Sequence, residues 1–405
     1  MRNSTVRTVN GLTRRWARSL RSGDSTVFTA AGLWPLLALL ADGADGPARD
    51  ELADALGIPA GEAAATAREL FEGLAGIGGL ETALGLWTRA GLPLRERWAA
   101  GLPEGTRGTL TGVPDADRAA LDTWAKERTG GLIEKMPVTD PAAALMVLAS
   151  ALALDVSWLH PFEPVPQRPA DGPWAGRTVA GLYRLTSSLD RVGVAQTPAG
   201  PLTVLQVGGE AGVDVHLVRA PEEVDAGEAL ALGLDVSTGV VPALPGDLLP
   251  EGTPGPGVTV GIVEAFSPAP SLEVSTVAFE VAAEHDLTER APLFGLATAL
   301  RDGDHFPGIS AEPLAVGEAR QSARAEFHAE GFRAAAVTAV AMRPGAGPPP
   351  AKHRVRRIRV AFDRPFGFLA VHRASGLVLA AGRVAEPLPY PAGTGPGGVV
   401  GRPRP

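Results

Sequence analysis

The sequence of 405 residues contains no cysteine. Disulfide bonds, thiolate catalysis and cysteine-containing metal sites are therefore excluded. The seven histidines are scattered, and none of them stands at the i, i+4 spacing of a helical metal-binding motif. We therefore predict that the protein holds no metal ion.

Membrane-spanning runs are also lacking. The apolar stretch at 33–41 is too short to span a bilayer, and residues 1–24 have no continuous apolar segment of the kind found in secretory signals. The net charge of −8 argues against wholesale binding to nucleic acid. We therefore predict a soluble, cytoplasmic protein with no membrane and no nucleic-acid partner.

The usual catalytic motifs are missing too. The sequence has neither a G-x-S-x-G nucleophile elbow nor a phosphate-binding loop with its lysine. The glycines within 76–79 are too few for a dinucleotide fingerprint and fit a turn. Glu222 and Glu223 are interpreted as charges on a solvated loop. We therefore predict that the protein is not an enzyme and uses no cofactor.

What the chain does have is a hydrophobic content of 45%, enough for a sizeable core. Helical periodicity dominates the first third, and patterns typical of strands dominate the last half. No repeat and no strand–helix–strand period is visible, which predicts an α+β fold in one large domain. Helices are predicted at 7–22, 33–41, 48–56, 62–74, 115–126, 287–291 and 293–300, a hairpin at 202–217, and strands at 82–89, 272–281, 323–328, 355–362, 366–372 and 377–384.

Two segments keep more than one interpretation open. Residues 143–158 form a continuous apolar run that fits either a buried helix or a strand covered on both faces. The basic cluster at 352–359 fits an exposed strand face with protective charge, but also an anion-binding patch or a site for a trypsin-like protease.

The most informative segment is 330–343, which alternates strictly. Every second residue from Phe332 to Met342 falls on one face, while Arg333 and Arg343 fall on the other, as in a half-buried strand. Yet the segment leads into the Pro/Gly-rich stretch 344–350, which is typical of an exposed loop. We infer a segment that can adopt two states.

A series of short motifs occurs in an order known from one protein family. The motifs are Leu121–Trp124, Thr129–Ile133, Ser150–Trp158 with Phe162, Gly308–Ser310, Asp363–Val371 and Gly382–Pro387. Each motif is weak by itself. Together, over about residues 8–388, they resemble the serpins, a family of serine protease inhibitors, and suggest a divergent bacterial member.

The resemblance implies a serpin domain at residues 1–388, with helices over a large mixed central β-sheet, two further sheets and an exposed reactive-centre loop at 329–353. Residues 389–405 are rich in proline and glycine and are expected to form a disordered tail. The implied function is inhibition of a serine endopeptidase by a metastable monomer. Such a protein acts as a suicide substrate, because its cleaved loop inserts into the central sheet. The family also leaves an extracellular location open.

The resemblance assigns roles to individual residues. The hinge of the loop would comprise Glu330, Gly331, Phe332, Ala334, Ala335 and Ala336. The reactive-site bond would join Gly345 and Ala346, with Met342 or Arg343 as alternatives. The region where the sheet opens would include Thr29, Ser150, Trp158 and Gln321.

Some of these residues depart from the family pattern. Phe332 stands at the first inserting position, where inhibitory relatives usually have a small residue, and forcing it into a closing sheet would cost about 1–3 kcal/mol by overpacking. Ala329 replaces a hinge glutamate. Thr29, Ser150 and Gln321 replace the usual Ser, Asn and His. These departures support an alternative function, that of a non-inhibitory binding or carrier protein or a plain protease substrate.

Overall fold

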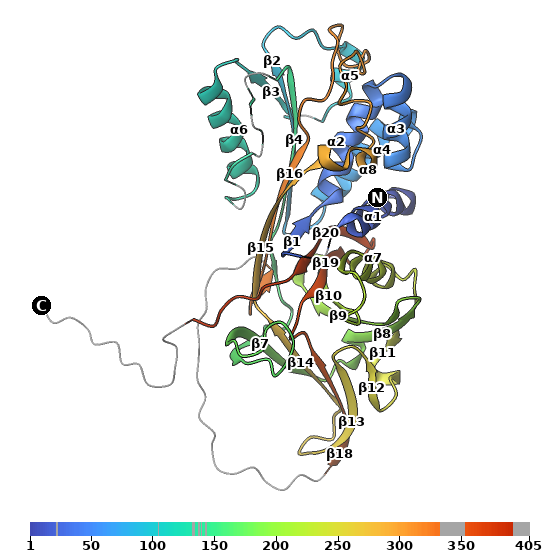
Figure 1. The fold of residues 1–405 in the computed structure, drawn as a ribbon, viewed down its shortest axis with the longest axis vertical. Helices are drawn as coiled ribbons and strands as arrows, with labels where there is room; N and C mark the ends of the chain where they lie inside the picture. The colour runs from blue at the N-terminus through green and yellow to red at the C-terminus, as the bar shows by residue number, and fades with distance from the viewer. Residues whose placement is uncertain are drawn as a thin grey trace, which may run out of the picture.

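The computed structural model places most helices at one end of the molecule and most strands at the other (Figure 1). It describes residues 1–21, 23–103, 105–131, 134–136, 138, 140–141, 144–332 and 353–391. None of the helices in these residues is long and apolar enough to cross a membrane.

Four helices form the N-terminal block: α1 (Asn3–Ser19), α2 (Ala30–Gly43), α3 (Gly46–Leu56) and α4 (Ala60–Ala75). The Thr29 hydroxyl caps α2 by accepting a hydrogen bond from the Gly32 amide at 3.1 Å. Gly57 ends α3 in the left-handed conformation, as predicted. Because α2 begins earlier than predicted, Pro35 lies inside this helix rather than in its first turn.

The other helices are α5 (Glu96–Ala100), α6 (Pro114–Arg128), α7 (Ala226–Ser237) and α8 (Ala291–Phe294), which follows a 3-10 turn at Leu287–Arg290. The helix predicted at 293–300 is wrong, because the left-handed Gly295 ends α8 at Phe294. Sequence reasoning missed α7 altogether. Its Leu230, Leu232 and Leu234 are all buried, so no amphipathic period marks it.

The described strands form four sheets, of which two are large. The seven-stranded sheet has the order β1 (Thr26–Phe28), β20 (Leu377–Val384), β19 (Phe366–His372), β10 (Val213–Arg219), β9 (Gly200–Gly208), β8 (Val192–Thr197) and β11 (Leu244–Pro245). The six-stranded sheet has the order β12 (Gly252–Gly255), β13 (Val258–Ala265), β18 (His353–Ala361), β14 (Ser271–Val277), β7 (Val179–Thr186) and β6 (Glu163–Gln167). The hairpin predicted at 202–217 is confirmed as β9 and β10.

The two smaller sheets meet at the centre of the molecule. One has the order β15 (Phe279–Asp286), β16 (Arg320–Phe327), β17 (Gly331–Phe332) and β5 (Val156–Ser157). The other has the order β3 (Arg107–Leu110), β2 (Leu80–Arg89) and β4 (Met146–Leu154). The strand predicted at 272–281 is therefore two strands, β14 and β15, because the chain changes sheets at Ala278.

The open question about residues 143–158 is settled in favour of strands, β4 and β5. Figure 1 shows why the run is apolar throughout: α6 lies on one side of β4, and α2 lies on the other. Val147 and Ala149 pack with Leu121 of α6 in a small separate cluster. A strand covered on both faces has no polar face to reveal its two-residue period.

The end of the described chain corrects the boundary of the predicted tail. Pro389 forms a bridge with Val179, and the Tyr390 amide donates to the Thr178 carbonyl at 3.2 Å. These residues are therefore held beside β7 rather than free. The rest of the predicted tail, residues 392–405, lies outside the described residues.

Candidate functional site

The described part of the predicted hinge, Glu330 to Phe332, belongs to a tight hairpin between β16 and β17, which we call the hinge hairpin or hinge below. The His328 amide donates to the Gly331 carbonyl at 2.9 Å and closes the turn. After the turn, Phe332 pairs with Phe327 of β16 on one side and with Val156 of β5 on the other. A Cβ on Gly331 would lie 2.6 Å from the Val156 carbonyl oxygen, so only glycine allows this close approach.

Trp158 fixes this hairpin to β5. Its indole N–H donates to the His328 carbonyl at 2.9 Å, and its backbone amide donates to the Glu330 carbonyl at 2.9 Å. The Phe162 amide donates to the Ala329 carbonyl at 2.8 Å. Three successive carbonyls of the hinge are thus bound, and the predicted hinge residue Glu330 contributes through its backbone.

The Phe332 side chain is already buried, with 3% of its surface exposed. Its ring centroid lies 6.3 Å from that of Phe368, and Phe279 stacks between Phe368 and Phe327 at 5.0 and 5.2 Å. Trp158 adds a further ring at 4.8 Å from Phe327. This corrects the overpacking expectation: the sheet accommodates Phe332 before any loop is cleaved.

Among the described residues, no strand joins the two small sheets beyond Phe332. In the described residues, β4 pairs only with β2, and β16 pairs with β15 along its length but with β17 only at Phe327. We call this boundary between β4 and β16 the seam. Beside Phe332, a small cavity of about 20 Å³ is lined by Leu152 and Leu154 from β4 and by Ala325 from β16, so the two strands face each other across the seam.

A polar cluster lies midway along the seam. The Gln321 amide group binds the backbone of Thr29 twice: its oxygen accepts from the Thr29 amide at 2.9 Å, and its nitrogen donates to the Thr29 carbonyl at 2.9 Å. The Thr29 hydroxyl donates to the Leu379 carbonyl at 2.7 Å. A Cβ on Gly32 would lie 3.6 Å from the Ser150 hydroxyl, which places Ser150 beside the start of α2.

The region predicted for sheet opening is therefore two sites rather than one. Thr29, Ser150 and Gln321 come together at the middle of the seam, whereas Trp158 lies at the hinge. Sequence spacing could not separate them, because Ser150 and Trp158 are only eight residues apart on one extended segment. Eight residues of strand nevertheless span about 26 Å.

A polar network supports the hinge from behind. Trp158 forms a bridge with Gly209, whose amide donates to Asp214 at 3.2 Å. Burial alone would raise the pKa of Asp214, but hydrogen bonds from Arg373 and Gln206 outweigh it and hold this pKa below its usual range. Burial also lowers the pKa of His216, on the same strand, to about 4.

Comparison with known proteins shows which family has this architecture. The family model described as serpin (serine protease inhibitor) matches residues 9–171 and 264–387, which is more than half of the chain. The chain belongs to the serpin family. Serpins in general interact with serine proteases and are protease inhibitors rather than enzymes.

Individual relatives cover this serpin almost completely. Putative serpin-Z8 of Oryza sativa subsp. japonica is 26% identical over 399 residues, which cover 90% of this chain and 91% of that protein. The thermophilic serpin tengpin in its native state covers 95% of both chains with a TM-score of 0.72 and 15% identity. Thyroxine-binding globulin in complex with thyroxine covers 95% of this chain and 99% of its own, with a TM-score of 0.70 and 15% identity. The predicted serpin fold is confirmed.

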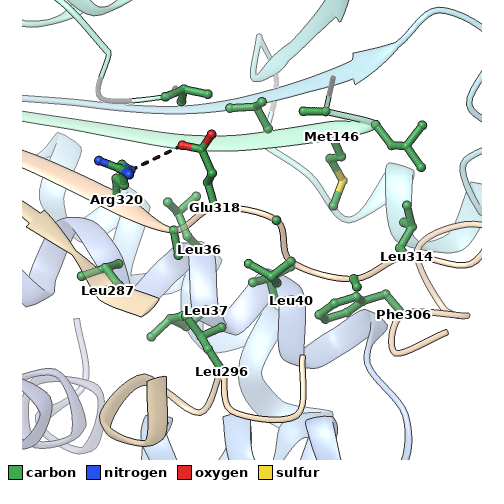
Figure 2. Close-up of a pocket in the computed structure, with 18 of the residues that line it drawn as sticks. Leu36, Leu37, Leu40, Met146, Leu287, Leu296, Phe306, Leu314, Glu318 and Arg320 are labelled. Carbon is green, nitrogen blue, oxygen red and sulfur yellow. Dashed lines mark ion pairs between the residues drawn. The ribbon is translucent and has the colours of Figure 1, made fainter. Parts of the chain in front are cut away.

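At its far end the seam of this serpin contains a cavity of about 450 Å³. Figure 2 shows Met146 pointing from β4 towards Leu40 of α2, with Phe306 and Leu314 closing one side. Sequence reasoning missed this cavity. Its lining comes from segments that are far apart in the chain, and each apolar residue is indistinguishable in sequence from an ordinary core residue.

The basic cluster of this serpin is a paired strand, β18. Arg359 Nε lies 3.1 Å from Glu273, and Arg357 Nε donates to the Ser271 hydroxyl at 3.2 Å. These contacts favour the interpretation as a charged strand face. Several predicted site residues lie outside the described residues: Ala334, Ala335, Ala336, Met342, Arg343, Gly345, Ala346 and Lys352.

Proposed function

We propose that this protein inhibits a serine endopeptidase as a suicide substrate. The protease serine attacks a carbonyl in the loop at 329–353, the peptide bond breaks, and its amine leaves as a new N-terminus. The loop segment that remains esterified to the protease then inserts along the seam as a new strand. Insertion carries the protease away from its starting position before water can hydrolyse the ester.

One observation carries this proposal: among the described residues no strand lies between β4 and β16 beyond Phe332, and β17 already pairs at one end of the seam. Strand edges with unpaired backbone groups are templates for a further strand. In the described residues, β4 and β16 both present such edges, and Phe332 lies between Val156 and Phe327 at one end. Insertion therefore does not have to start a new strand. It extends the strand pairing that Phe332 already makes with Val156 and Phe327.

The pairing of Phe332 also supports a register for the inserted strand. Residue 342 is ten positions after Phe332, and Met146 is ten positions before Val156, so these two would face each other. By the same count Thr338 would face Ser150 and Gln321, which places the one hydroxyl of the inward face at the polar cluster. Ala334 and Ala336 lie between Phe332 and Thr338. In this register they would face the core between the hinge and the polar cluster, where small side chains fit.

The reactive bond is proposed at Gly345–Ala346, with Met342 or Arg343 as alternative specificity residues. All three choices leave at least the segment 333–342 on the acyl side, which is long enough to reach Met146 in the register above. The protein is proposed to act as a monomer, because the inserted strand comes from its own chain.

The test is thermal unfolding before and after limited proteolysis within 340–352, with mass spectrometry to locate the bond. Insertion adds a ladder between β4 and β16, and we expect the midpoint to rise on the order of 10 °C or more. Incubation with serine proteases should also yield a covalent complex stable in SDS. An unchanged midpoint after complete cleavage would contradict insertion and leave a static serpin scaffold.

A further inference from the structure

The cavity at the far end of the seam, which we call the chamber, is lined mainly by apolar residues, with Asp140, Glu318 and Arg320 as its charged ones. On one wall, α2 contributes side chains with the spacing of a single helix face, Leu33, Leu36, Leu37 and Leu40. This face runs for about 10 Å along the helix axis. Other apolar lining residues include Met146, Val147, Leu287, Leu296, Phe306 and Leu314.

Water is poorly suited to fill this space. Ordered internal water needs two to four polar partners, whereas most of this lining is aliphatic or aromatic. The volume of about 450 Å³ falls in the range of pockets that bind small molecules. An apolar chamber of this size also loses dispersion contacts when it is empty, so an apolar occupant would stabilise the surrounding structure.

The charged residues at the rim of the chamber determine which class of ligand can bind there. Arg320 lies 3.4 Å from Glu318 and 3.4 Å from Asp286, and the Asp140 amide donates to Glu318 at 3.2 Å. Figure 2 shows the ion pair between Glu318 and Arg320 at the edge of the apolar walls. Glu318 and Asp286 both pair with Arg320, so these rim groups carry negative charge in excess. An anionic head group would be repelled there, and a cationic one would lose hydration while competing with Arg320 for carboxylates that already have a partner.

We propose that this chamber binds an uncharged, elongated, apolar molecule, such as a long-chain alcohol or an isoprenoid. The ligand would lie along the leucine face of α2, beneath Met146. If loop insertion operates as proposed above, the bound ligand would occupy the place where the inserted strand ends. The ligand would then slow the completion of insertion and divert the protein towards simple hydrolysis.

The test is calorimetric titration of the uncleaved protein with 1-decanol, with decanoate and decylammonium as charged probes of equal chain length. We expect 1-decanol to bind at least about tenfold more tightly than either charged probe. Failure of 1-decanol to bind, or equal binding of the three probes, would overturn the proposal.

Three loop variants locate the binding. Val316 lines the chamber, so Val316→Trp should fill it and weaken 1-decanol binding at least about tenfold. Ala311 lies on the same loop, is exposed and does not line the chamber, so Ala311→Trp should bind like the wild type. If Val316→Trp fails to fold, Ala315→Trp fills the rim from an exposed position. Equal binding by a folded filling variant and the control would overturn the assignment.

A second readout addresses the coupling to insertion. 1-Decanol should lower the fraction of protease-treated protein that reaches the heat-stable form, and Val316→Trp should remove this effect. This result rests on the proposed function, whereas calorimetry on uncleaved protein does not. If 1-decanol binds but the cleaved protein without ligand yields no heat-stable form, only loop insertion is contradicted. If the heat-stable form appears but 1-decanol does not bind, only the ligand site is contradicted.

Discussion

The two ends of the seam between β4 and β16 are built on opposite principles. At the hinge end, β17 joins the neighbouring strands, and Phe332 completes a run of aromatic rings from Trp158 to Phe368. At the far end, no described strand bridges the seam, and the space behind it is a chamber of about 450 Å³. In the part of the chain that the structure describes, one end is packed and paired, while the other has a cavity and no bridging strand.

This difference would give the proposed insertion a direction. Starting a new strand between two others costs conformational entropy before hydrogen bonds to the neighbouring strands can offset that cost. The hinge end has already met that cost, because β17 is ordered and its Phe332 is buried. The far end then provides a cavity and the edges of β4 and β16, which pair with no further strand among the described residues. An inserting strand would therefore grow from the hinge towards the chamber.

The largest expected effect comes from a substitution that would stop the inserting strand in the middle of the seam. In the proposed register, residue 336 faces Leu152 and Ala323 on the core side, so Ala336→Glu would bury an uncompensated carboxylate. We expect this variant to lose most of the thermal gain that follows loop cleavage, as measured by calorimetry.

The neighbouring position supplies a matched control. Residue 335 would lie between the exposed Arg324 of β16 and the buried Ala153 of β4 on the other face of the sheet, with its carboxylate beside the Arg324 guanidinium, so Ala335→Glu should keep most of the gain. Equal behaviour of the two glutamate variants would refute the register derived from Phe332.

The second prediction removes the packing at the hinge end. Phe332→Ala should lower the free energy of unfolding of the uncleaved protein by about 4 kcal/mol, since it leaves a cavity among aromatic rings. Equilibrium denaturation in guanidinium measures this. Phe266→Ala is the control, because that side chain is 53% exposed and should change stability little. A loss no larger than that of the control would show that the hinge end is not preassembled.

The third prediction concerns His216, which lies on the same strand as Asp214 of the polar network behind the hinge. Burial lowers the pKa of His216 from 6.5 to about 4, with Asp214 and Arg191 as its charged neighbours. The unfolded chain therefore takes up a proton at a higher pH than the folded protein does. The stability from neutral His216 is complete above pH 6.5 and is lost as the pH falls towards 4, by about 3 kcal/mol in total.

Paired denaturation series at different pH test this. His216→Asn should show a smaller loss of stability between pH 7 and pH 4 than the wild type does. His285 and His372, whose pKa values are lowered mainly by burial, are common to both proteins and cancel in the difference. Parallel pH curves for the two proteins would exclude His216 as the source.

The smallest expected effect concerns the middle of the seam. Gln321→Ala removes both hydrogen bonds to the Thr29 backbone and should cost about 2 kcal/mol of unfolding free energy. Ser322→Ala, next on the same strand, serves as the control for the side-chain truncation. If the two variants are equally stable, the polar cluster does not hold α2 to β16.

Several elements could be predicted because their signals are local. The N-terminal helices carry periodic apolar faces, and Gly57 marks the end of α3. The hairpin of β9 and β10 alternates on both sides of a glycine turn. Other elements have no such signal: β7 and β8 contain mixed patterns, and α7 is buried on nearly all sides. Those elements are buried by segments far away in the sequence. Such burial leaves no periodic pattern in the local sequence from which the element could be predicted.

By itself, the sequence determined the family and the order of its motifs, and it predicted two states for the segment at 330–343, most of which lies outside the described residues. These depend on residue types at given positions along one chain. Only the tertiary structure decided that Phe332 is already buried, that Trp158 and Gln321 belong to different sites, and that a chamber lies under Met146. Each of these depends on how closely segments far apart in sequence approach one another, and close packing is a property of the folded chain alone.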